Sequence, residues 1–249
     1  MPNSVRAVVF DLDGTLVETA ADIHAVLSDV LAEAGLVGPD LPTVRGMIGD
    51  GAKVLIERAL IAIGEPASPA GIDTLHDRFR ERYAQVPCRF SVPYPGAREL
   101  LAGLRRAGCR LGLCTNKPHV ATLGLLQALA LDTALDAVVG GDLLPGIRKP
   151  HPGHLADVLL RLDTPRGAAI MVGDSRTDLL TARALGVRCI LVSFGYTSVP
   201  ARQLGADHVI DRLADLPAAM ARLRTLPAAP RARGTESATI NLRGRLIRG

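Results

Sequence analysis

Short apolar runs recur along this chain, and each is followed by a polar loop and then by apolar residues at helical spacing. The runs cover residues 7–10, 110–114, 137–139, 168–172, 189–192 and 207–210. Strands that alternate with helices in this way favour a doubly wound, mostly parallel β-sheet, so the pattern predicts an α/β fold. In such sheets ligands bind at the carboxyl ends of the strands.

The first two runs lie about 100 residues apart, whereas one strand–helix–strand unit needs roughly 30. The sequence between them is helical in pattern: Thr19 can cap a helix that reaches Ala34 and stops at Gly35, and further helices are expected over residues 52–63 and 69–86. Prolines within residues 87–95 indicate a return hinge. We therefore expect a core domain of residues 1–17 and 92–226, with residues 18–91 as an inserted helical cap placed to act as a lid.

Composition and charge limit the classes of partner. The chain of 249 residues is 48% hydrophobic but only 3% aromatic, with no Trp, so stacking surfaces for single-stranded nucleic acid are scarce. The net charge of +4 comes from the segment 227–249, which holds five arginines and one acidic residue. We expect this segment to be a flexible basic tail on an electrically neutral body, and we expect no nucleic-acid partner.

The four cysteines form no C-x-x-C pair, and two of them fall in apolar runs. This usage favours reduced thiols in the cytoplasm. The sequence shows no basic-then-apolar leader and no apolar stretch of spanning length, so we expect no membrane partner. A monomer and a small homo-oligomer both stay open.

Two carboxylates follow the first apolar run. Residues two apart in an extended chain point to the same side, so Asp11 and Asp13 would project together from the end of a strand before Gly14 turns the chain. A bound cation would relieve their repulsion. The alternative is an ordinary Asx-type turn. A calcium-binding EF-hand loop does not fit, because Thr15 and Leu16 stand where that loop needs Asp or Asn and then Gly.

Polar residues also follow the second and third runs. Thr115 and Asn116 come at the start of a predicted helix, where free backbone N–H groups attract anions, although Asn116 could instead only cap that helix. Lys149 precedes a proline that favours an extended conformation, so its ammonium could reach across the strand ends, or it could simply be solvated. His151 and His154 lack a third ligand in sequence, and we give them little weight as a metal site.

The fourth run ends at a further acidic group. Ser175 and Asp178 fit a capping box, which accounts for Asp178 in structural terms. Asp174 has no such explanation, and a third carboxylate at a strand end would complete oxygen coordination of a small hard cation, for which Mg²⁺ is the natural candidate.

These motifs together resemble the haloacid dehalogenase-like (HAD) hydrolase superfamily, in particular phosphatases that have a small helical cap after the first strand. The resemblance covers about residues 5–215 and rests on DLDGTLVET, CTNKP, RKPHP and GDSRTD. Within the superfamily, TNKP, GGD, KPHP, GDSRTD, residues 48–52 and residues 194–196 are most similar to the phosphoglycolate phosphatase family.

The resemblance implies a Mg²⁺-dependent phosphatase for a small phosphorylated metabolite, most similar to enzymes that act on 2-phosphoglycolate. It implies that Asp11 attacks phosphorus to form an aspartyl-phosphate and that Asp13 is the general acid and base. The implied Mg²⁺ ligands are the carboxylates of Asp11 and Asp174 and the carbonyl of Asp13. Thr115, Asn116 N–H and Lys149 would hold the phosphoryl oxygens, and Asp178 would orient Lys149 or the metal shell.

The substrate's far end is expected to meet the cap. Gly49 to Gly51, with Arg45 and Lys53 nearby in sequence, could bind a carboxylate there; the alternative is a glycine turn with solvated cations. A phosphosugar mutase of the β-phosphoglucomutase type shares the core residues and is an alternative function, as is a pyrophosphatase. A non-enzymatic binding protein is disfavoured because Asp11, Asp13, Lys149 and Asp174 are all present.

Overall fold

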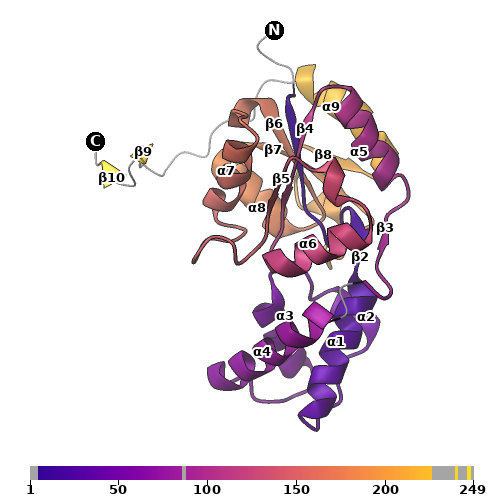
Figure 1. Cartoon of the computed structure of the whole chain (residues 1–249), viewed down its shortest axis with the longest axis vertical. Helices are drawn as coiled ribbons and strands as arrows, with labels where there is room; N and C mark the ends of the chain where they lie inside the picture. The colour runs from indigo at the N-terminus through magenta and orange to yellow at the C-terminus, as the bar shows by residue number, and fades with distance from the viewer. Residues whose placement is uncertain (1–4, 86–87, 226–238, 241–245, 248–249) are drawn as a thin grey trace.

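A computed structural model describes residues 5–85, 88–225, 239–240 and 246–247. Its centre is a six-stranded parallel sheet in the order β5-β4-β1-β6-β7-β8 (Figure 1). The strands are β1 (Ala7–Phe10), β4 (Arg110–Cys114), β5 (Ala137–Val139), β6 (Ala169–Gly173), β7 (Arg188–Val192) and β8 (His208–Ile210). The predicted α/β fold is confirmed, with strand bounds shifted by at most one residue from the apolar runs.

Helices cover both faces of the sheet, and the alternation of side chains along each strand explains why. In β1, Val8 and Phe10 join the core beneath α5 (Ala97–Arg106), α6 (His119–Ala128) and α9 (Leu216–Thr225). Ala7 and Val9 point to the opposite core beneath α7 (Pro152–Arg161) and α8 (Arg176–Leu185). Strands buried on both faces must be apolar throughout, which is why they appear in the sequence as continuous runs.

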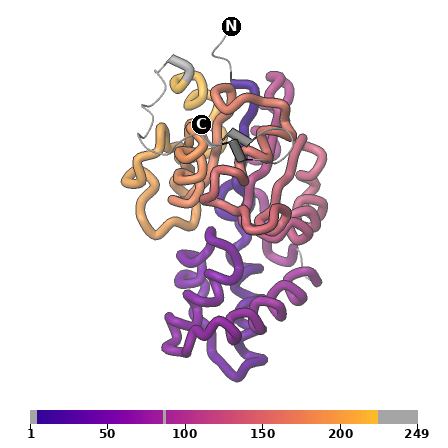
Figure 2. The backbone as a smooth tube through the Cα atoms, turned by 90° about the vertical axis from the view of Figure 1, so that its left-hand side faces the viewer, coloured from indigo at the N-terminus to yellow at the C-terminus, as the bar shows by residue number. Residues whose placement is uncertain are grey.

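Residues 20–85, inserted between β1 and β4, form a second body beyond the carboxyl ends of the strands, indigo to magenta in Figure 2. It contains α1 (Ala20–Glu33), α2 (Leu41–Arg45), α3 (Ala52–Ala62) and α4 (Pro69–Gln85), with a core that includes Leu31, Ile56 and Phe79. Its two ends meet in a short antiparallel pair of β2 (Val17–Glu18) and β3 (Val92–Pro93). Helix α2 is too short for the sequence pattern to predict it. The division into domains at 17/18 and 91/92 stays a prediction.

Short 3₁₀ turns occur at Asp132–Ala134, Arg166–Ala168, Ala201–Gln203 and Leu213–Asp215. In the basic tail, β9 (Thr239–Ile240) pairs only with β10 (Leu246–Ile247), and the rest of that segment lies outside the described residues, so its flexibility stays a prediction. No helix within the described ranges combines the length and apolar character needed to cross a bilayer.

Candidate active site

Asp11 follows directly after β1 and lies almost fully buried at the edge of the sheet. Its Oδ1 is 2.8 Å from Lys149 Nζ, which is also 2.7 Å from Asp178 Oδ1. Burial raises the pKa of Asp11 to about 7, although Lys149 acts to lower it. Burial alone would lower the pKa of Lys149, but Asp11 and Asp178 outweigh it and hold that pKa above its usual value. Lys149 is therefore a buried ammonium shared by two carboxyl groups.

Asp174 follows β6 and is clamped by neighbouring backbone. The Tyr196 N–H donates to its Oδ2 at 2.7 Å, and Thr15 Oγ1 lies 3.5 Å from its Oδ1. Gly195 packs so closely that a Cβ there would lie 2.1 Å from Asp174 Cβ. Gly14, at φ +81°, is similarly close, with a Cβ position 2.6 Å from Asp174 Oδ2. The site therefore requires glycine at both positions.

Asp178 forms the predicted capping box at the start of α8. Ser175 caps the helix by accepting from the Asp178 N–H, and Asp178 Oδ2 accepts from the N–H groups of Asp174 and Ser175 and from the Ser175 hydroxyl. Its other oxygen faces Lys149. Asp178 therefore caps α8 and also contacts Lys149, while its expected role of orienting the lysine or the metal shell stays a prediction.

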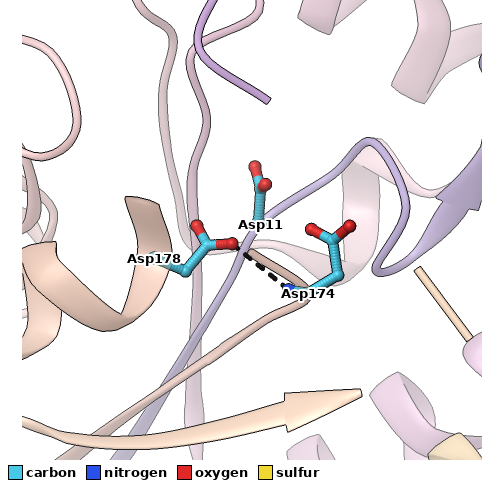
Figure 3. Close-up of side chains that lie close together, drawn as sticks. All are labelled: Asp11, Asp174 and Asp178. Carbon is cyan, nitrogen blue, oxygen red and sulfur yellow. Dashed lines mark hydrogen bonds between the residues drawn. The ribbon is translucent and has the colours of Figure 1, made fainter. Parts of the chain in front are cut away.

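The residues present fit a small divalent cation. Asp11, Asp174 and Asp178 each offer one oxygen within 4.8 Å of the others (Figure 3). Burial, together with the nearby Asp178 and Asp11 charges, raises the pKa of Asp174 well above its ordinary value. Three buried carboxyl groups lie together, and the one ammonium beside them pairs with only two of them, so a hard cation with oxygen ligands matches both the donor set and the excess negative charge. The expected proximity of Asp11 and Asp174 is met; the identity of the metal stays a prediction.

The Asp13 side chain contacts residues other than those around Asp11 and Asp174. Its Oδ1 accepts from Thr19 Oγ1 at 2.7 Å and from Lys117 Nζ at 3.1 Å. Lys117 Nζ also donates to Tyr83 Oη, 2.7 Å away on helix α4. Thr19 does hold the N-cap position of α1, but its hydroxyl makes no capping bond, so the predicted side-chain cap is wrong: the hydroxyl is used for Asp13 instead.

Thr115 and Asn116 follow β4 and are both buried. The Asn116 side chain does not cap the next helix, because Pro118 occupies that N-cap position. Its Nδ2 donates instead to Gly49 O at 3.1 Å and to Lys149 O at 3.0 Å. Asn116 therefore connects the end of β4 to Gly49 in the insert and to the loop that carries Lys149.

The strand ends border a cavity of about 470 Å³ between the sheet edge and helices α3 and α4, and Lys149, Asp174 and Asp178 are not part of its lining. Among the predicted site residues, its lining includes Asp11, Asp13, Gly49, Gly51, Thr115 and Asn116. Arg45 and Lys53 are not part of this lining. Arg45 forms an ion pair with Glu18 and lies over the Tyr196 ring, and Lys53 pairs with Asp73 at the surface. The structure thus directs both cations away from the position that we expected for them.

Two residues of the site were not singled out by the sequence. Lys117 lies within the CTNKP motif, where the hydroxyl and amide drew attention, and its position just after a strand end was an available signal. Tyr83 lies on α4, a mostly polar helix, and nothing local distinguishes it. Only the packing of α4 against the core brings its hydroxyl to Lys117.

Comparison with known proteins agrees with this architecture. The sequence profile of the haloacid dehalogenase-like hydrolases matches residues 8–192. A phosphoglycolate phosphatase from Caulobacter vibrioides is 42% identical over 225 residues, covering 90% of this chain and 94% of the relative.

Two solved structures have a similar fold. A predicted phosphoglycolate phosphatase from Haemophilus somnus aligns with a TM-score of 0.79 at 28% identity, over 86% of this chain and 96% of the other. A mutant CbbY from Rhodobacter sphaeroides in complex with xylulose-(1,5)bisphosphate aligns with a TM-score of 0.73 at 27% identity, over 87% and 99%. The family profile and the phosphoglycolate phosphatase relative confirm the predicted enzyme class, a phosphoric monoester hydrolase. The chain belongs to the haloacid dehalogenase-like hydrolase family.

Proposed function

We propose that this protein is a Mg²⁺-dependent phosphatase that hydrolyses 2-phosphoglycolate to glycolate and phosphate through an aspartyl-phosphate. The observation that carries the proposal is the position of Asp11: its carboxyl group lies beside Lys149, within 4.8 Å of Asp174 and Asp178 oxygens, and lines the cavity under the inserted helices. The relative named phosphoglycolate phosphatase, at 42% identity over 90% of the chain, supports the choice of substrate.

In the first step, an Asp11 oxygen attacks phosphorus and the bond to the ester oxygen breaks. Asp13 gives its proton to the departing glycolate oxygen, an acid–base contribution typically worth about 10²–10⁴-fold. Thr19 holds Asp13 toward the cavity through the 2.7 Å hydrogen bond. Asp11 and Asp13 are the first and third residues after β1, and both line the cavity, which supports these two roles.

In the second step, Asp13 takes a proton from water, and the hydroxide formed attacks phosphorus and releases Asp11. Lys149 and Thr115, together with the Asn116 backbone N–H, would stabilise the charge on the phosphoryl oxygens. When bound by Asp11, Asp174 and the Asp13 carbonyl, Mg²⁺ would supply the positive charge that lets an anionic nucleophile approach an anionic phosphate. The Asp178 carboxylate, 2.7 Å from Lys149 Nζ, would hold the ammonium in position.

The decisive test replaces Asp11 by Asn. The Asp11→Asn protein should lose phosphate release from 2-phosphoglycolate by a factor of at least about 10⁴, because the amide is a poor nucleophile. Near-ultraviolet circular dichroism should match the wild type, which shows that the fold is kept. A folded Asp11→Asn protein with near wild-type turnover would contradict the mechanism.

Sugar phosphates are a second substrate class worth testing. The cavity of about 470 Å³ is larger than a two-carbon ester needs, and CbbY, of similar fold, was solved with a sugar bisphosphate. A panel of phosphomonoesters and pyrophosphate, assayed with and without Mg²⁺, separates these cases. Isomerisation of β-glucose-1-phosphate without phosphate release would identify a mutase.

We also propose a cytoplasmic location, consistent with four free cysteines.

A further inference from the structure

Lys117 is a buried cation that faces the cavity of the active site. Only 6% of its surface is exposed, and it belongs to the cavity lining together with Asp13 and Tyr83. An ammonium group has three N–H donors. The described contacts of Lys117 Nζ are with the Asp13 carboxylate, at 3.1 and 3.4 Å, and with Tyr83 Oη, at 2.7 Å. The longer of the two Asp13 contacts, at 3.4 Å, is the one that a molecule in the cavity would replace.

Lys117 is held as a cation at this position. The Asp13 carboxylate and the Tyr83 hydroxyl both accept from the ammonium, which stabilises its positive charge. The ammonium also lies 4.4 Å from the centre of the Tyr83 ring, which adds a favourable cation–π contact. The other charged groups in the lining are one cation, Arg80, and the acidic residues Asp11, Asp77, Glu81 and Asp142.

Charge, and not volume, must select a small acid in this cavity. A space of about 470 Å³ admits esters much larger than a two-carbon phosphate. The acidic lining groups repel anions, so a substrate carboxylate is favoured only beside a cation. Asp13 is the group proposed to protonate the ester oxygen, and Lys117 lies 3.1 Å from it. In 2-phosphoglycolate the carboxylate carbon is two bonds from that same oxygen, which brings the carboxylate within reach of Lys117.

We propose that Lys117, positioned by Tyr83 of helix α4, is the cation that binds the substrate's carboxylate and so selects phosphomonoesters of short 2-hydroxy acids. This inference rests on the proposed function and deepens it. The site spans both parts of the molecule, because Lys117 follows β4 and Tyr83 comes from the inserted helices. Substrate selection would therefore depend on the contact of α4 with the core.

The test compares two substrates of the same shape. Phosphoglycolamide carries a neutral amide in place of the carboxylate of 2-phosphoglycolate. The ratio of kcat/KM for the acid over the amide should fall about 10- to 100-fold in Lys117→Met, the range expected for one hydrogen bond to a charged group. The control Arg202→Met removes an exposed cation that pairs with Asp211, and it should leave the ratio unchanged.

The ratio separates the possible outcomes. If Lys117 only supports Asp13, both substrates lose the same factor, the ratio stays constant and the inference is overturned. If the wild type releases phosphate from neither compound, the proposed function itself fails. Binding gives a readout that needs neither turnover nor a Lys117 variant: calorimetry on the Asp11→Asn protein with Mg²⁺ should show tighter binding of the acid than of the amide. Equal affinities there would also overturn the inference.

Discussion

The loop that carries Lys149 is held by a histidine that does not itself line the cavity. Behind Lys149, the fully buried His154 accepts from the Lys149 backbone N–H through Nδ1 at 3.2 Å, and its Nε2 lies 3.1 Å from Gly140 O. Both ring nitrogens are therefore satisfied in the neutral form, with the proton on Nε2. Burial lowers the pKa of His154 to about 4. A neutral histidine thus fixes the lysine loop against the sheet.

This arrangement predicts a loss of stability in mild acid. Between pH 6.5 and about 4 the unfolded state binds the His154 proton and the folded state does not, so lowering the pH favours unfolding. The contribution lost by pH 4.5 is about 2–3 kcal/mol, because pH 4.5 lies about two pH units below the ordinary histidine pKa and each of them changes the free energy of unfolding by about 1.36 kcal/mol. Urea unfolding at pH 7.5 and 4.5 measures it. The stability advantage of the wild type over His154→Asn should shrink by this amount; an equal advantage at both pH values would refute the prediction.

Among the helices, α1 anchors the return of the chain to the core. The Asp22 carboxylate accepts from the backbone N–H groups of Arg89, Phe90 and Ser91 and from the Ser91 hydroxyl. These N–H groups lie just before β3, so Asp22 joins the start of α1 to the segment that leads back to the core. Since β3 pairs with β2, one carboxylate and one short strand pair together close the two connections of the insert.

Replacing Asp22 with Asn should destabilise the protein by about 2–3 kcal/mol, because an amide NH₂ group would face backbone donors in a buried position. The matched control is Asp29→Asn on the same helix. The Asp29 side chain is 61% exposed, and its ion pair with Arg82 Nη1 is long, at 3.9 Å. That change should stay within roughly 0.5 kcal/mol, as for most surface substitutions. The two urea midpoints decide the matter, and similar losses in both variants would argue against an anchoring role for Asp22.

At the scale of the whole molecule, the acidic cluster exists only in the folded chain. Asp11 and Asp174 are about 160 residues apart in sequence and meet because β1 and β6 are adjacent parallel strands that end at the same edge. A cation that binds this cluster binds the folded state and not the unfolded chain, so it must stabilise the fold.

Magnesium should therefore raise the melting temperature independently of catalysis. At ten times the dissociation constant the gain in unfolding free energy is about 1.4 kcal/mol. Asp174→Asn should abolish this gain, whereas Asp157→Asn, which removes a carboxylate paired with Arg161 on α7, should keep it. Differential scanning calorimetry with MgCl₂ and with EDTA provides the measurement. A Mg²⁺ shift that persists in Asp174→Asn would place the ion elsewhere.

Much of the scaffold was predictable because it follows from local rules. Strands buried on both faces must be apolar, so they stand out in the sequence, and parallel strands present their carboxyl ends at one edge. These two rules place the residues after Phe10, Cys114 and Gly173 near one another without any knowledge of packing. The capping box of Ser175 and Asp178 was predictable for the same reason, since it involves residues three apart.

Contacts between the insert and the core were decided by the tertiary structure alone. Asn116 donates to the Gly49 carbonyl, Thr19 turns its hydroxyl to Asp13, and Tyr83 reaches Lys117, and no helix or strand periodicity predicts these pairs. A helical pattern determines which face of a helix is buried but not which polar partner it meets on another part of the molecule. The sequence by itself therefore determined the sheet and its row of strand-end groups, and only the packing of the helices over that row decided which cations face the cavity.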